Sequence, residues 1–258
     1  MTPSAPTPHS AARHYLNLPQ ARTVTTSQVR AAANALHTTV EQQAMMCLSG
    51  PPGTGKTFTL HTLIAQHPHW QTLSLLVRPQ ARPEDLRARL YRALQLPGTA
   101  PKNPGICDDL IRHALHHPPR LLAIDEAHQL SASCLEYLRF LHEDTHTRLA
   151  VLLLASDHRI KALRAQPVLT SRVHTWHHFQ SLTEPELLTT LPAFHPQWHD
   201  TDPQLITTLN TAWAHGNFRR WAALTHRLAS LAHRTGRRPL HDAHPLLKQL
   251  QPRPTTRP

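Results

Sequence analysis

Short apolar runs alternate with longer segments of mixed polarity along the chain as far as residue 179. Five runs carry the signal of buried strands, at 44–48, 72–77, 121–124, 149–155 and 173–179. The pattern therefore predicts an α/β domain with a largely parallel five-stranded sheet.

Segments with apolar residues at helical spacing separate these runs. They lie at 27–43, 58–66, 84–94, 107–117 and 131–143. In the first segment Val29, Leu36 and Val40 fall on one face, and Ser27 is a candidate N-cap. Strands and helices in alternation indicate the crossover connections that parallel strands need.

Beyond residue 179 only helical patterns remain. Thr183 and Glu186 form a capping-box pattern, and two further helices are expected at 203–214 and 217–235. A small helical domain therefore follows the α/β core. The expected organisation has four parts: an extended or disordered N-terminal segment at 1–26, the α/β core at 27–180, the helical domain at 181–238 and a proline-rich basic tail at 239–258.

Positive charge is concentrated toward the end of the chain. The net charge is +11, and the segment Gly216–Pro258 has nine basic residues against the single acid Asp242, which leaves +8 there. Such a block favours a polyanionic partner, foremost duplex DNA. A contribution to solubility alone, or a bias toward arginine codons, is the alternative interpretation.

Cysteine usage and hydropathy narrow the class of protein. Cys47, Cys107 and Cys134 are scattered and form no CxxC pair, which indicates reduced core thiols. The apolar runs are too short to span a bilayer, and the N-terminus lacks the apolar segment of a signal peptide. The 23 histidines show no metal-ligand spacing, so ordinary imidazoles are the simpler interpretation. We expect a cytoplasmic protein without membrane contact.

One motif carries a specific chemistry. It matches the pattern GxxxxGK[ST] of a Walker A motif, or P-loop. Its eight residues are Gly50, Pro51, Pro52, Gly53, Thr54, Gly55, Lys56 and Thr57. An expected strand precedes the loop and an expected helix follows it, as this motif requires. The glycines let backbone N–H groups wrap a phosphate, Lys56 reaches the β- and γ-phosphates, and Thr57 ligates Mg²⁺. The sequence therefore predicts a site for ATP and Mg²⁺.

Asp125 and Glu126 supply the second half of such a site. They follow the apolar run 121–124, so we expect them at the carboxyl edge of the sheet, where ligands bind in open α/β folds. As in a Walker B motif, Asp125 would hold Mg²⁺ through water and Glu126 would polarise the attacking water. An acidic strand end in an ordinary turn is the alternative.

Two arginines are candidates to complete the site. Arg172 lies just before the fifth run and could reach a neighbouring subunit's γ-phosphate as an arginine finger; otherwise it is a surface arginine. Arg219 opens the last helix, where it could touch bound nucleotide, or it simply belongs to the basic block. Ser156 or Asp157, after the fourth run, is a weaker candidate for orienting water.

A stripe of basic residues lies on the last expected helix. Arg220, Arg227 and Arg234 recur every seven residues and so share one face. The apolar face comprises Phe218, Trp221, Leu224, Leu228 and Leu231. The stripe could follow a DNA backbone, and a solvated helix face accounts for it equally well.

In this order, the motifs resemble those of the AAA+ ATPases. The resemblance covers residues 44–235 and includes the P-loop, Asp125-Glu126, a polar residue after the fourth strand, Ser171-Arg172 and the Gly-Asn-x-Arg pattern at 216–219. It implies the strand order 5-1-4-3-2, a helical lid and ATP hydrolysis, which we expect to be slow, as suits a switch. It also implies self-assembly into a ring or filament with the nucleotide between subunits.

Within AAA+, the compact layout and the segment 216–220 resemble the TniB/TnsC/MuB group. Those bacterial ATPases assemble on DNA and regulate a transposase or integrase. The Gly-Asn-x-Arg pattern is also similar to ExeA-like and origin-recognition ATPases. Two functions are therefore open: a DNA-bound ATPase switch in transposition, or an ATPase, ExeA-like or STAND-like, that remodels or signals to a protein partner without DNA.

Overall fold

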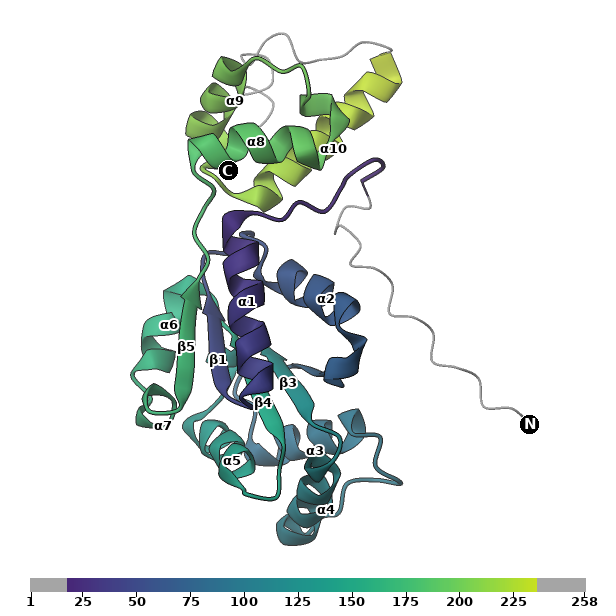
Figure 1. The fold of residues 1–258 in the computed structure, drawn as a ribbon, viewed down its shortest axis with the longest axis vertical. Coiled ribbons are helices and arrows are strands. Elements are labelled where there is room, and N and C mark those ends of the chain that lie inside the picture. Colours follow the sequence, from purple (N-terminus) through teal and green to yellow (C-terminus); the bar gives the residue numbers. More distant parts are fainter. Residues whose placement is uncertain (1–17, 236–258) are drawn as a thin grey trace, which may run out of the picture. The chain divides into compact units, whose positions relative to one another are not determined.

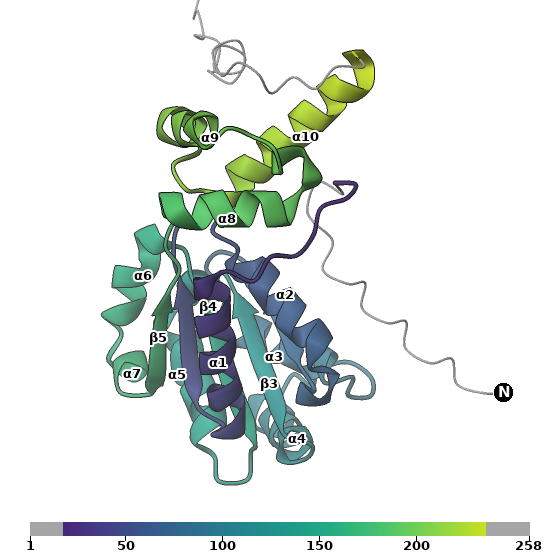
Figure 2. The same ribbon diagram turned by 45° about the horizontal axis from the view of Figure 1, so that its top comes forward.

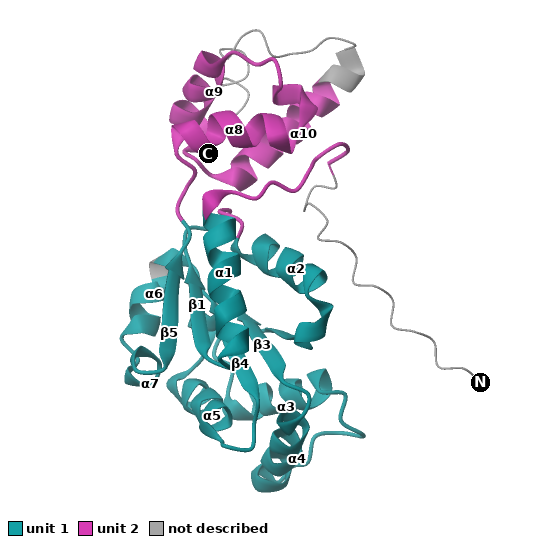
Figure 3. Ribbon diagram, viewed as in Figure 1, with its two compact units in different colours: residues 1–12, 28–52, 56–179 teal, residues 13–27, 53–55, 180–258 magenta. Residues whose placement is uncertain are grey.

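The computed structural model describes residues 18–235, which form two compact units (Figure 1, Figure 3). The α/β unit comprises 28–52 and 56–179. The helical unit comprises 18–27, 53–55 and 180–235. The expected tail at 239–258 and most of the expected N-terminal segment at 1–26 lie outside the described residues.

A five-stranded sheet in the order β2-β3-β4-β1-β5 forms the centre of the α/β unit, and every strand pair is parallel. The strands are β1 (Met45–Ser49), β2 (Leu73–Leu76), β3 (Arg120–Asp125), β4 (Leu149–Leu154) and β5 (Val173–His178). This confirms the predicted fold class and the strand order that the resemblance implied. Leu48 pairs with Leu154 and Ile124 with Leu153, which brings the carboxyl ends of three strands to one edge.

Helices cover both faces of this sheet (Figure 1, Figure 2). Met46 and Leu48 of β1 pack on the face covered by α1 (Ser27–Glu41) and α2 (Lys56–Gln66). Met45 and Cys47 pack on the opposite face. The helices there are α3 (Pro83–Ala93), α4 (Pro104–His116), α5 (Ala132–Glu143), α6 (Asp157–Arg164) and α7 (Pro167–Thr170). Burial on both faces explains the continuous apolar runs of β1, β3 and β4, whereas the edge strands β2 and β5 are partly exposed.

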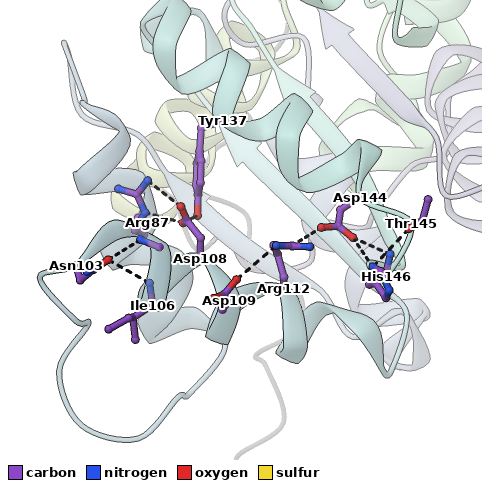
Figure 4. Close-up of polar contacts among 11 residues, drawn as sticks. Arg87, Asn103, Ile106, Asp108, Asp109, Arg112, Tyr137, Asp144, Thr145 and His146 are labelled. Carbon is purple, nitrogen blue, oxygen red and sulfur yellow. Dashed lines mark hydrogen bonds and ion pairs between the residues drawn. The ribbon is translucent and has the colours of Figure 1, made fainter.

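A largely buried ion pair joins three of these helices (Figure 4). Arg87 of α3 donates from Nε and Nη2 to the two carboxylate oxygens of Asp108 on α4, at 2.6 and 3.2 Å. The hydroxyl of Tyr137 on α5 donates to Asp108 Oδ1 at 2.7 Å, and the Arg87 guanidinium lies 4.8 Å from the centre of the Tyr137 ring. Removal of one partner would leave a poorly hydrated charge, so this cluster fixes the packing of α3, α4 and α5.

The helical unit packs its helices around two tryptophans. The helices are α8 (Glu184–Phe194), α9 (Pro203–Leu209) and α10 (Phe218–Thr235). Trp198 and Trp221 are fully buried and meet edge to face, with 5.3 Å between ring centres. Trp198 Nε1 donates to Thr225 Oγ1 at 2.9 Å, which satisfies the polar atom of a buried indole.

Helix boundaries depart from the predictions where an asparagine intervenes. The helix predicted at 203–214 is α-helical as far as Leu209 and continues as a π-helical turn, Asn210–Ala214. Asn210 accepts from His215 N–H through its backbone oxygen at 2.8 Å and from Gly216 N–H through its side-chain oxygen at 2.6 Å. At Asn103 the side-chain oxygen accepts from Gly105 N–H at 2.9 Å, so α4 starts earlier than predicted (Figure 4). The short helices α6 and α7 were not predicted.

Candidate functional site

The loop between β1 and α2 turns sharply at its glycines. Gly50, Gly53 and Gly55 have φ values of +144°, +86° and +102°, in the region that side chains disfavour. A Cβ at Gly50 would lie only 2.4 Å from the backbone oxygen of Phe179, so packing also requires glycine there. α2 begins at Lys56, so the N–H groups of its first turn adjoin the loop, as anion sites at helix starts require.

The Lys56 side chain turns back onto this loop. Its Nζ donates to the backbone oxygens of Gly50 and Pro51, at 2.7 and 2.9 Å. A phosphate would accept stronger, charge-assisted bonds from the same ammonium than these neutral carbonyls do. The loop therefore holds a cation that can turn to an anionic ligand.

Thr57 and Asp125 meet at the carboxyl edge of the sheet. Thr57 Oγ1 donates to Asp125 Oδ2 at 3.1 Å, and the N–H of Glu126 donates to Asp125 Oδ1 at 2.8 Å. Hydroxyl and carboxylate oxygens are ligands that Mg²⁺ prefers, and Mg²⁺ usually keeps water and phosphate ligands as well. Among residues 18–235 no group of three or more His, Cys, Asp or Glu side chains could hold a metal ion. The pair therefore fits a cation that phosphate oxygens help to bind.

Glu126 follows the strand in an unusual backbone conformation. Its φ of 57° and ψ of 35° lie in the left-handed region, which is uncommon for residues other than glycine. Its side chain is 44% exposed, and Oε2 lies 3.3 Å from Nε2 of His128, which is only 8% exposed. We did not single out His128 from the sequence. The available signal was its position two residues after Glu126, within the tight turn that ends the strand.

Ser156 and Asp157 follow β4, the neighbour of β1 in the sheet. The N–H of Asp157 donates to the Gly50 oxygen at 3.2 Å, which connects the end of β4 to the loop. Ser156 Oγ lies 3.3 Å from His128 Nδ1, while Asp157 Oδ1 lies 3.4 Å from His178 Nδ1. Of the two weaker candidates, Ser156 is the one that contacts the partner of Glu126.

Arg172 lies at the edge of the sheet opposite the loop. The next residue, Val173, pairs with Met45 at the start of β1, whereas the loop follows Ser49 at its end. Such a strand spans about 13 Å, which places Arg172 out of reach of the loop in its own chain. Its Nε donates to Glu143, and this contact lowers the pKa of the Glu143 carboxyl.

In the helical unit, residues 53–55 contact the start of α10. The N–H of Arg219 donates to the Gly53 oxygen at 3.1 Å. A Cβ at Gly53 would lie 2.5 Å from Asn217 Oδ1 and 2.9 Å from Arg219 Cβ, so this close approach requires glycine. The backbone of Arg219 is therefore fixed on the tip of the loop, and its side chain is exposed.

The basic stripe of α10 is uneven. Arg220 Nη1 donates to the backbone oxygen of Trp213 at 2.6 Å, so this guanidinium has a partner within the helical unit. Arg227 is exposed, and the side chain of Arg234 lies outside the described residues. On the other side of the helix Trp221 is buried, as the predicted apolar face requires.

The sequence of the α/β unit matches a known family. The model for an AAA domain matches residues 38–163, a segment that contains the loop, Thr57, Asp125 and Glu126. No curated protein matches the chain in sequence.

Several solved structures resemble the fold. ORC2 from Aeropyrum pernix, in ADPNP and ADP complexes, has a TM-score of 0.66 at 17% identity, over 93% of this chain and 70% of that one. Cdc6p from Pyrobaculum aerophilum has a TM-score of 0.67 at 14% identity, over 84% and 66%. Drosophila ORC bound to DNA has a TM-score of 0.65 at 17% identity, over 97% and 68%. At these identities the likeness shows a shared fold, an α/β fold with an AAA+ P-loop core, and within it residues 38–163 match the model for an AAA domain.

Proposed function

We propose that this chain is a slow ATPase, which converts ATP and water to ADP and phosphate. The observation that carries the proposal is the 3.1 Å contact between Thr57 Oγ1 and Asp125 Oδ2. Thr57 is the residue that follows Lys56 in the loop motif. The hydroxyl of Thr57 and the carboxylate of Asp125 are suitable ligands for Mg²⁺. The lysine at the start of α2 is suited to bind phosphate. The AAA domain supports this proposal, as does the similarity to a structure described with ADPNP and ADP.

Each residue has one role in this proposal. Lys56 exchanges its loop carbonyls for β- and γ-phosphate oxygens, and the N–H groups of residues 50–55 wrap the phosphates. Thr57 and Asp125 would hold Mg²⁺, Asp125 through water, and the ion would neutralise phosphate charge. Glu126 accepts the proton of the attacking water. Arg219 of the lid touches the bound nucleotide.

In this proposal a neighbouring subunit supplies one further group to the nucleotide site, the side chain of Arg172. Arg172 lies too far from its own loop to act there, which supports a role as an arginine finger toward the γ-phosphate of a neighbouring subunit. Its bond to Glu143 would then be exchanged when subunits meet. We propose a ring or filament in which the nucleotide lies between subunits.

The proposed partner is duplex DNA, and the proposed task is regulation of a transposase or integrase. The +8 charge of Gly216–Pro258 supports DNA binding, and one similar structure is Drosophila ORC bound to DNA. The transposition role depends on the motif resemblance to the TniB/TnsC/MuB group. ATP binding would switch assembly on the duplex, and hydrolysis would end it.

A second function has an observation in its favour. Arg220, one of the three stripe arginines, donates to Trp213 within the helical unit, which weakens the case for a dedicated DNA surface. An AAA+ ATPase that remodels or signals to a protein partner without DNA would not need the stripe.

None of the helices within residues 18–235 is long and apolar enough to cross a membrane.

We place the protein in the cytoplasm within this proposal. The three cysteines are free and buried, as is common where thiols stay reduced.

Binding of a fluorescently labelled duplex tests the proposed function. We expect cooperative, sequence-tolerant binding with ATP and Mg²⁺ at low salt, much weaker binding with ADP, and no ATP dependence in Lys56→Ala. Affinity should fall steeply as salt rises, because each neutralised phosphate releases counterions. If the wild-type protein hydrolyses ATP but binds no duplex at low salt, the protein-remodelling function replaces the DNA-bound one.

A mixing experiment tests the finger. Arg172→Ala should bind ATP normally and lose hydrolysis, whereas Lys56→Ala keeps the finger and lacks the loop cation. A mixture of the two should regain activity if one subunit supplies Arg172 and the other the loop. Absence of rescue, with a monomeric ATP-bound state, would remove this role.

A further inference from the structure

His128 lies between Glu126, the proposed base, and Ser156, a candidate for orienting water. It belongs to a short 3-10 helix, Ala127–Gln129, which begins two residues after the end of β3. Its Nε2 lies 3.3 Å from Glu126 Oε2, and its Nδ1 lies 3.3 Å from Ser156 Oγ and 3.5 Å from the backbone N of Ser156. The imidazole therefore connects the end of β3 to the end of β4.

These contacts determine the tautomer of the ring. A carboxylate can only accept, so Nε2 carries the proton toward Glu126. The Ser156 N–H can only donate, so Nδ1 keeps its lone pair on that side. The neutral Nε2–H tautomer satisfies both contacts at once, and the ring is buried enough to hold one orientation.

Glu126 needs such a partner. Its side chain is 44% exposed, so packing against neighbours does not by itself fix the position of its carboxylate. A base works only when it lies within hydrogen-bond reach of the water that it deprotonates. An error of about 1 Å in that position can cost about a hundredfold in rate.

We propose that His128 is a positioning residue for ATP hydrolysis: it holds the Glu126 carboxylate through Nε2 and ties it to Ser156 at the end of β4. The inference depends on the proposed role of Glu126 as the base. It adds a mechanical link, because β4 also reaches the loop through the Asp157 N–H and the Gly50 oxygen. Movement of the loop would therefore reach Glu126 through Ser156 and His128.

Turnover and binding should separate in His128→Ala. At saturating ATP and Mg²⁺ we expect kcat to fall about ten- to hundredfold, while the affinity for a fluorescent ATP analogue changes less than about twofold. His128→Gln keeps an N–H donor near the Nε2 position and should recover part of the rate. His113→Ala replaces an exposed histidine of α4 and should behave like the wild type. A wild-type or raised kcat in His128→Ala overturns the proposal, and a raised rate would identify the contact as a restraint on Glu126.

A double-mutant cycle asks whether His128 acts through Glu126. In the Glu126→Gln background, His128→Ala should cost little further rate, because the group that it positions is already lost. Independent, multiplying losses would overturn the proposal.

A nucleotide-free measurement keeps this inference distinct from the proposed function. Imidazole ¹⁵N spectra of the full chain should contain an Nε2–H tautomer signal that disappears in His128→Gln and shifts in Glu126→Ala and in Ser156→Ala. An Nδ1–H tautomer, or a signal that Glu126→Ala leaves unmoved, overturns the contact. If the spectra behave as expected but Glu126→Gln hydrolyses at the wild-type rate, the role of Glu126 as base is wrong, and the positioning role of His128 falls with it although the contact itself stands.

Discussion

The α/β unit and the helical unit place their candidate residues in different ways. In the first, Lys56, Thr57 and Asp125 lie at the ends of buried elements and make polar contacts between 2.7 and 3.1 Å. In the second, Arg219 and Arg227 lie on the exposed surface of one helix. A strand end fixes the position of a side chain, whereas a helix face fixes only the direction in which a side chain points. The candidates of the α/β unit therefore predict a nucleotide site with defined contacts, and those of the helical unit predict only a positively charged surface.

The largest expected effect tests the first half of this comparison. Lys56→Ala removes the loop cation and with it the charge-assisted bonds to phosphate, so ATP affinity should fall about a hundredfold or more while the fold survives. Titration with a fluorescent ATP analogue measures the change. Lys102→Ala replaces an exposed lysine of the α3–α4 connection and is the matched control. Undiminished affinity in a folded Lys56→Ala protein would contradict the assignment of the P-loop.

Glu126→Gln should separate hydrolysis from binding. The amide keeps the shape of the side chain but cannot take a proton, so we expect a loss of about 10²–10⁴ in kcat with ATP affinity nearly unchanged. Single-turnover phosphate release measures the rate. Glu136→Gln changes an exposed carboxylate of α5 and should leave the rate unaltered. Hydrolysis at the wild-type rate by the Glu126→Gln protein would mean that another group is the base.

The two units also differ in how much of them could be predicted. Each strand end lies within one residue of its predicted run, and in β1, β3 and β4 burial on both faces makes the run continuous in the sequence. The roles of Lys56 and Asp125 follow from a motif with fixed spacing. At the π-turn and at the start of α4, the side chains of Asn210 and Asn103 accept backbone hydrogen bonds, which periodicity does not contain. His128 was missed for a related reason, since its contact with Ser156 joins two separate strand ends.

Two loop glycines allow a matched test within the helical unit. Gly53→Ala and Gly55→Ala both place a side chain at positive φ, a strain of about 1–2 kcal/mol. At Gly53 the new Cβ also meets Asn217 and Arg219, whereas at Gly55 nothing lies within 4 Å. Gly53→Ala should therefore lower the free energy of unfolding by about 1–3 kcal/mol more than Gly55→Ala does. Equal losses in urea titrations would mean that the contact of the loop tip with α10 contributes nothing.

A pH titration should reveal a buried histidine in each unit. Burial lowers the pKa of His142 in α5 and of His195 after α8. Below about pH 6.5 the unfolded chain then binds more protons than the folded one, so stability should fall as the pH decreases. His195 Nδ1 also accepts from Gln197 N–H at 3.2 Å, a bond that protonation removes. His195→Gln should reduce the loss of stability at acid pH, which tryptophan fluorescence of the helical unit monitors. An unchanged slope would show that His195 binds protons equally in the folded and unfolded states.

The smallest effect concerns the surface of α10. If the helical unit contacts the DNA backbone, Arg227→Ala should reduce the slope of log K against log salt by about one unit, because one phosphate contact contributes about 0.9. All three stripe arginines together should reduce it by roughly three at most, but Arg220→Ala also removes the bond to Trp213, so Arg227→Ala is the cleaner change. Arg159→Ala, an exposed position on α6 of the α/β unit, serves as the control. A lower slope for Arg227→Ala alone would assign DNA contact to the helical unit. A lower slope for Arg159→Ala alone would move the contact to the α/β unit, and unchanged slopes for both would leave the stripe as a solvated helix face.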